Sequence, residues 1–146
     1  MRDHDKRAIR EAFHMPTPIF VRIAADHFVV DGEPLSVLTG RLLRTQFLRK
    51  LFQRGALVCY APDGVESTEG IYCDSCRHPR CRPYLRLYLD RGAVHFVLDL
   101  GPASARNFLA LEDDVIAEGL RFELCPLRLT VTPRGSWGEV RFQRFP

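Results

Sequence analysis

Four cysteines are the feature that most limits how this chain of 146 residues can fold. Cys73, Cys76 and Cys81 have the spacing C-x2-C-x4-C, and Cys59 precedes Cys73 by fourteen residues. A C-x2-C step lets a tight loop direct two thiolates at one ion, which is the commonest half of a tetrahedral zinc site. We therefore expect one structural zinc ion, bound by all four thiolates and left with no open position for a reacting water.

The segment that carries these cysteines, residues 59–82, has little else to hold it in one conformation. It contains Pro62, Gly64, Gly70 and Pro79 but few apolar side chains. Metal binding supplies folding free energy to such a segment, because the site does not exist in the unfolded chain. The expected zinc therefore stabilises the loop and does not catalyse a reaction.

Other uses of these thiols stay open at this point. The cysteines could be close together by chance, or two of them could form a redox pair, although the C-x-x-C step lacks the βαβ setting of redox proteins. An iron–sulfur cluster on the same four cysteines is another, because spacing does not separate it from zinc. Cys59 has the alternative role of a small buried hydrophobe, in which case His78 is the substitute ligand. Cys125 stands alone in the sequence and is expected in the core.

Basic residues gather beside the cysteines. The net charge is only +3, but Arg77, Arg80, Arg82 and Arg86 lie within ten residues of one another. Positive charge near thiolates lowers their pKa and offsets the negative charge of a four-thiolate site. Four arginines exceed that need, so we also expect a rigid basic loop that contacts an anionic polymer.

The order of predicted elements favours a mainly β fold. Proline after residue 14 limits a first helix to residues 3–14, and a hairpin follows at 19–23 and 27–30. A helix is expected over residues 37–53, because Leu43, Phe47 and Leu51 recur every four residues. The remaining expected elements are strands at 56–61, 84–90 and 93–100, a helix at 105–119, and strands at 122–132 and 139–145.

Three strands, a helix and two strands follow one another in the OB-fold, a five-stranded barrel. The expected class is therefore α+β, mainly β: an OB-like barrel over residues 55–146, with the zinc loop 59–82 inserted between its first two strands. The helix, hairpin and helix of residues 1–54 are expected to pack on it as an extension. Length suits one domain over residues 1–146. Another α+β sheet is the alternative.

The strand at 84–90 is expected to present a binding surface. Leu85, Leu87 and Leu89 alternate with more polar residues and are expected in the core. The opposite face then carries Tyr84, Arg86 and Tyr88, and rings with guanidinium groups bind the bases and phosphates of single strands. Further candidates on the later strands and their turn are Arg128, Trp137 and Arg141. Aromatic residues also favour strands for structural reasons alone.

No catalytic motif marks the chain as an enzyme. Glycine-rich phosphate loops, G-x-S-x-G elbows and H-E-x-x-H helices are absent from the sequence. The acidic residues at 112–114 are consecutive, so on a helix they point in different directions and form no shared site. The sequence also contains no signal peptide or apolar stretch of membrane-spanning length, so a cytoplasmic location is expected.

The segment CYAPDG followed by C-x2-C-x4-C, with this strand order, resembles zinc-containing OB-fold proteins that bind single-stranded DNA, and related uncharacterised proteins of phages and mobile elements. The resemblance covers about residues 55–145. It implies a barrel with structural zinc and a basic groove. We expect a zinc-stabilised binding module for single-stranded nucleic acid, with DNA favoured over RNA. The alternative is a zinc-stabilised subunit that binds an acidic protein surface or forms a homodimer.

Overall fold

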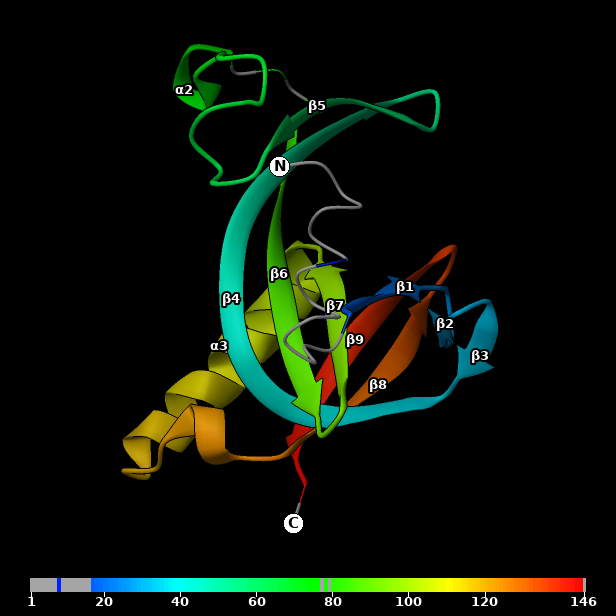
Figure 1. Ribbon diagram of the computed structural model, residues 1–146, viewed down its shortest axis with the longest axis vertical. Helices are drawn as coiled ribbons and strands as arrows, with labels where there is room; N and C mark the ends of the chain where they lie inside the picture. Colours follow the sequence, from blue (N-terminus) through cyan, green and yellow to red (C-terminus); the bar gives the residue numbers. More distant parts are fainter. Residues whose placement is uncertain (1–7, 9–16, 77, 79, 146) are drawn as a thin grey trace.

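The protein is mainly β in a computed structural model that describes residues 8, 17–76, 78 and 80–145. Nine strands form one mixed sheet, which α3 (Pro102–Ala117) covers on one side (Figure 1). The expected α+β, mainly β class is thereby confirmed. The helix expected over residues 3–14 lies outside the described residues, apart from Ala8.

The sheet is open. Its strand order is β3-β2-β1-β7-β6-β4-β8-β9, with β5 paired to β4, and all neighbours are antiparallel except β1 and β7. The expected closed barrel is therefore wrong for the described residues: β3 and β9 end the sheet, and β1 takes the edge of β7 that a closing strand would need. The strands are β1 (Ile19–Ile23), β2 (Phe28–Val30), β3 (Glu33–Leu35), β4 (Val37–Gln53), β5 (Ala56–Ala61), β6 (Arg82–Arg91), β7 (Val94–Leu100), β8 (Leu127–Arg134) and β9 (Trp137–Arg144).

Residues 37–53 form a strand and not the expected helix. The pattern that suggested a helix, Leu43, Phe47 and Leu51, has a spacing of four, which is also a multiple of the two-residue period of a strand. The three residues would therefore share a face in a regular helix or in a regular strand. The pairing of this segment with β6, β8 and β5 decides in favour of the strand.

β4 is long and curved, and it joins three parts of the protein (Figure 1). Val37–Gly40 pairs with β8, Arg41–Lys50 with β6, and Arg49–Gln53 with β5. Gly40 lies where β4 leaves β6, and an added Cβ there would be 3.0 Å from the backbone oxygen of Asp90. The absent side chain lets the two strands approach closely at this bend.

The core lies between the sheet and α3. Phe108 of α3 is buried and makes edge-to-face contacts with Phe122 and Phe142, at ring distances of 5.4 and 5.5 Å. Burying one such ring contributes about 2–3 kcal/mol. The helix expected over 105–119 is confirmed but begins earlier, with Gly101 as its N-cap. Ser104 lies inside the first turn, where its Oγ accepts a hydrogen bond from the Val140 N–H at 2.8 Å.

The other sequence-based elements are largely confirmed. The hairpin of β1 and β2 is present and gains β3, and β6 and β7 match the expected strands. The strand expected from residue 122 starts later, because Phe122–Leu124 forms a short 3-10 helix before β8. Among the described residues, no helix is long and apolar enough to cross a membrane.

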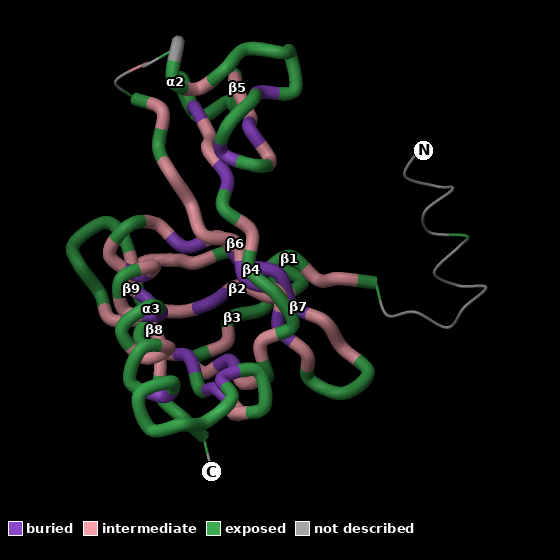
Figure 2. The backbone as a smooth tube through the Cα atoms, turned by 90° about the vertical axis from the view of Figure 1, so that its left-hand side faces the viewer, coloured by how far each residue is buried: buried purple, intermediate pink, exposed green. Residues whose placement is uncertain are grey.

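The end of β4, β5 and the segment 59–82, here named the cysteine loop, form a lobe that projects from the rest of the protein. Figure 2 shows this lobe joined to the main body through the strands β4 and β6. Few of its residues are buried, among them Leu51, Ala61 and Ser67. The lobe therefore has only a small hydrophobic core of its own.

Candidate metal centre and basic groove

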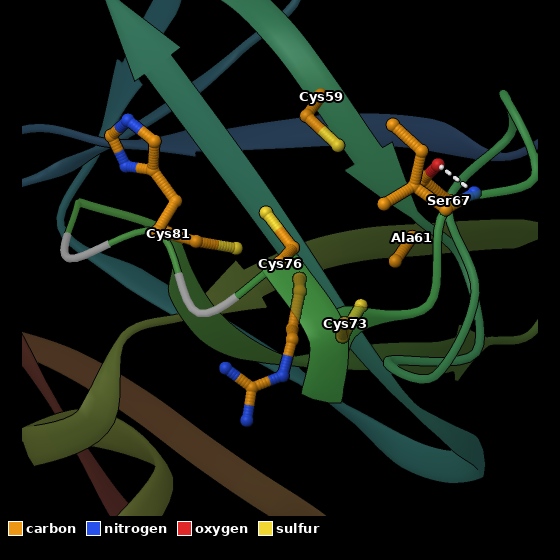
Figure 3. Close-up of a pocket in the computed structure, with 9 residues that line it drawn as sticks. Cys59, Ala61, Ser67, Cys73, Cys76 and Cys81 are labelled. Atoms are coloured by element: carbon orange, nitrogen blue, oxygen red, sulfur yellow. Dashed lines mark hydrogen bonds between the residues drawn. The ribbon is translucent and has the colours of Figure 1, made fainter.

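The four cysteines expected to bind zinc line one cavity. Cys59 comes from β5, Cys73 and Cys76 bound the short helix α2 (Cys73–Cys76), and Cys81 directly precedes β6. The cavity has a volume of about 40 Å³, which is room for one ion or very few waters. Figure 3 shows the four side chains directed around this common space. The fold thus gathers residues that are up to 22 positions apart in the sequence (81 − 59).

Two other lining residues bear on metal binding. Arg49 of β4 brings a positive charge to the thiols, and His78 also lines the cavity, so it stays an alternative to Cys59 as the fourth ligand. The His78 Nδ1 accepts a hydrogen bond from the backbone N–H of Arg80 at 3.2 Å, which leaves Nε2 as the nitrogen able to bind a metal.

The thiols share a cavity but do not form a completed ligand set. All five cysteines of the chain are free, and within the described residues no three or more Cys, His, Asp or Glu side chains are grouped so that they could hold an ion. Burial raises the pKa of Cys73, the thiol of Cys81 raises it further, and Arg49 lowers it. The nearby thiol of Cys81 thus adds to the effect of burial on Cys73, and Arg49 offsets part of it.

Local hydrogen bonds shape the cysteine loop around the cavity. Asp63 Oδ1 accepts hydrogen bonds from the N–H groups of Val65 and Glu66 at 2.8 and 3.0 Å, which lowers the pKa of Asp63. Ser67 Oγ accepts the N–H of Ile71 at 3.1 Å. The side chains of Val65 and Ile71 are exposed, so polar turns and not apolar packing define this segment.

The face of β6 predicted to bind nucleic acid has the expected alternation. Leu87 and Leu89 are buried, whereas Tyr84, Arg86 and Tyr88 are partly exposed on the opposite side. Cross-strand pairing places residues of β4 beside them, so the aromatic and basic surface extends over two strands.

Arg86 is paired within this face. Its Nε and Nη2 donate hydrogen bonds to the two carboxylate oxygens of Asp99 at 2.7 and 3.0 Å, and Lys50 also donates to Asp99. Burial tends to raise the pKa of Asp99, but the hydrogen bonds from Arg86 and Lys50 outweigh it and lower the pKa. Asp99 is therefore ionised, and the positive charges of Arg86 and Lys50 balance its negative charge. The pair of Arg86 and Asp99 also links β6 to β7.

Tyr88 is also engaged. Its hydroxyl donates a hydrogen bond to Gln46 Oε1 at 2.9 Å, and the Arg44 guanidinium lies 3.9 Å from the centre of its ring. Both partners belong to β4. At this end of the face, Tyr88 therefore already makes a cation–ring contact within the protein.

A basic groove runs from the lobe to the start of α3. Its smaller cavity, of about 360 Å³, is lined by Lys50, Phe52, Arg80, Arg82 and Tyr84. Its larger cavity, of about 590 Å³, is lined by Arg82, Tyr84, Asp99, Arg106, Trp137 and the first turn of α3, among others. The two cavities share Arg82 and Tyr84 as lining residues and are together named the basic groove.

Three of the cations in this groove are available to a ligand. Within the described part of the chain, Arg80, Arg82 and Arg106 make no ion pair, and the single lining carboxylate, Asp99, is neutralised by Arg86 and Lys50. The groove thus combines free positive charge with three aromatic rings.

Four of the predicted nucleic-acid-binding residues line the groove: Arg80, Arg82, Tyr84 and Trp137. Arg128 and Arg141 lie on β8 and β9 and line neither cavity, and Arg141 pairs with Glu139 at 2.8 Å. Arg77 lies outside the described residues.

Sequence reasoning missed three groove residues, and it placed Cys125 correctly. Lys50 and Phe52 were assigned to a helix, although two-residue spacing placed them together, and Arg106 gave no signal. Cys125 packs partly buried against the main core, as expected. In comparisons with protein-family models, curated proteins and solved structures, the chain matches none, so its function is argued from these residues alone.

Proposed function

We propose that this protein is a binding module for single-stranded nucleic acid whose cysteine loop is stabilised by a structural zinc ion. One observation carries the proposal: two cavities that share Arg82 and Tyr84 combine three aromatic rings with three arginines that have no ion-pair partner among the described residues. DNA remains favoured over RNA through the resemblance described above.

The chemistry of the groove suits a strand with unpaired bases. Rings such as Phe52 and Tyr84 offer stacking surfaces to bases, while Arg80 and Arg82 offer charge-assisted hydrogen bonds to phosphates. A duplex hides its base faces, so it would gain only the phosphate contacts. The combination therefore favours a single strand over a duplex.

The cysteine cavity supports the metal part of the proposal. Cys59, Cys73, Cys76 and Cys81 would supply four thiolates, with His78 as the alternative to Cys59 and an iron–sulfur cluster as the alternative cofactor. A bound zinc would supply folding free energy to the lobe. Arg80 lies two residues after the cavity residue His78, and Arg82 lies one residue after Cys81. A stabilised loop would therefore fix both arginines at the groove.

We also propose that the fold is an open relative of the OB-fold. Strands β4, β6 and β7, then α3, then β8 and β9 follow the order of that fold, with β4 in place of residues 56–61 as the first strand. β5 and the cysteine loop then form the insertion between the first two strands, and the hairpin of β1 and β2 lies where closure would occur.

Salt dependence of oligonucleotide binding tests the proposal. Fluorescence anisotropy of a labelled single strand is measured at several salt concentrations for the wild type and for Arg80→Gln/Arg82→Gln. Each lost phosphate contact lowers the log–log salt slope by about 0.7, so the double variant should lose about 1.4. Arg41→Gln/Arg91→Gln is the matched control, since both residues are exposed at the far end of the β4–β6 pair. Equal slopes in all three proteins contradict the proposal.

A second candidate function is supported by the surface of the lobe. Phe52, Leu57, Val58, Val65, Ile71 and Tyr72 are exposed there, which is typical of a protein-interaction surface. In this case the protein is a zinc-stabilised assembly subunit, as a homodimer or with a protein partner. Sedimentation that shows a dimer, together with no oligonucleotide binding, favours this candidate.

A further inference from the structure

We infer that the larger cavity of the groove holds one unpaired base of the bound strand, stacked on Trp137, with the neighbouring phosphate on Arg82 and Arg106. The inference rests on the proposed function and assigns a particular position of the ligand to a particular cavity. It gives the start of β9, which is far from the cysteine loop in sequence, a direct part in recognition.

The size and walls of the cavity suit one nucleotide. Its volume of about 590 Å³ falls within the range of small-molecule pockets, about 300–1,000 Å³. Tyr84 and Trp137 both line it, and within the described residues their rings make no contact with each other. Both rings therefore line the space in which a flat group would lie.

Trp137 offers an unused ring face. Its side chain is 49% exposed, and in the part of the chain that the structure describes it contacts neither another ring nor a cation. Trp137 is the first residue of β9 and lines the larger cavity, so this ring face is accessible to a flat group there.

Gly138 fixes the position of Trp137. A Cβ at this glycine would overlap the backbone oxygen of Ala24 and a methyl group of Val131, so only glycine lets the start of β9 lie against the β1–β2 turn. The backbone next to Trp137 is therefore closely packed, which fixes where the tryptophan side chain leaves the chain.

The charges at the cavity indicate where the phosphate lies. Arg82 and Arg106 line it without an ion-pair partner among the described residues, and Asp99 is already neutralised. Arg82 also lines the smaller cavity, so it would contact the phosphate between two successive nucleotides. The strand would thus continue from the larger cavity toward Arg80 and the cysteine loop.

The intrinsic fluorescence of the protein tests this inference directly, because Trp137 is the only tryptophan in the sequence. The unlabelled single strand is titrated into wild-type protein while tryptophan emission is recorded, and anisotropy of a labelled copy is recorded in parallel. We expect emission to fall with the same midpoint as the anisotropy change, since a stacked base quenches the indole.

Two variants complete the test. Trp137→Ala should bind about tenfold more weakly, the loss expected for one stacked base. Phe145→Ala removes another exposed ring, outside the groove, and should bind as the wild type does. Anisotropy that shows binding without any change in emission overturns the inference and leaves the proposed function standing. Absence of binding by both readouts overturns the proposed function and the inference with it.

Discussion

Arg49 and Lys50 are neighbours on β4 and face opposite sides of it: Arg49 lines the cysteine cavity, and Lys50 pairs with Asp99 and lines the basic groove. One strand therefore forms a wall of both features. β4 continues into the hairpin with β5, so the cysteine loop and the groove share this strand. This relationship links the proposed zinc to the proposed binding of nucleic acid.

The first prediction concerns the metal ligands. Cys73→Ser and Cys76→Ser should each lose the bound zinc, because each removes one of four thiolates. Zinc per chain is measured by elemental analysis of the purified variants. Cys125→Ser is the matched control and should retain the metal, since Cys125 packs against the main core.

The same measurement identifies the fourth ligand. Loss of zinc in Cys59→Ser with retention in His78→Ala assigns Cys59, and the opposite result assigns His78. Full zinc content in both Cys73→Ser and Cys76→Ser contradicts the four-thiolate site.

The second prediction concerns the stability of the lobe. Removal of the metal by a chelator should speed amide hydrogen exchange in residues 59–82, because the lobe has little apolar packing to replace the lost binding energy. Exchange in β6 and β7 around Leu87 and Leu98 should stay slow, since both side chains are fully buried in the main core. Uniform loss of protection across the chain would show that the lobe is not a separate unit of stability.

The third prediction concerns the ion pairs of Asp99. Its pKa is lowered in the folded protein, so it stabilises the fold above the ordinary pKa of about 3.9 and loses this effect as pH falls through the folded value. Asp99→Asn should destabilise the protein by about 3 kcal/mol near neutral pH, because Arg86 and Lys50 then lie partly buried without a counter-charge.

Urea unfolding at two pH values measures this effect. The free energy of unfolding should fall less in Asp99→Asn than in the wild type between about pH 6 and pH 3. Asp113→Asn serves as the control, since Asp113 is an exposed residue of α3. If acid lowers the free energy of unfolding equally in Asp99→Asn and the wild type, the ion pairs of Asp99 do not stabilise the protein.

The fourth prediction concerns the support of Trp137. Gly138→Ala should lower the free energy of unfolding by about 1–3 kcal/mol, because the new methyl group overlaps Ala24 and Val131. It should also change the near-ultraviolet circular dichroism of Trp137. In Gly101→Ala the added Cβ meets no atom within 4 Å, so the cost should be clearly smaller. Equal stability of the two variants would show that the turn moves freely.

Local patterns in the sequence predicted much of the sheet. The alternation of Leu87 and Leu89 with Tyr84 and Tyr88 identified β6 and its two faces, because a strand has a fixed period of two. Gly119 correctly marked the end of α3, which stops two residues before it. The four cysteines were expected at one place, and the structure brings them to one cavity.

The errors arose where a local pattern has two solutions. The spacing of Leu43, Phe47 and Leu51 fits a helix and a strand equally. The strand is selected by pairing with β6 and β8, whose residues are distant in the sequence. The sheet likewise stays open because β1 pairs with β7, a long-range pairing that no local pattern specifies. Arg106 belongs to the groove because α3 begins beside Trp137, and that contact is visible only in the fold.

The metal content of the protein, purified without added metal, tests the central claim most directly. We predict about one zinc ion per chain, bound by the thiolates that line the cysteine cavity. Protein that is folded and free of zinc and iron would contradict the claim that a bound metal holds the cysteine loop and its arginines in place.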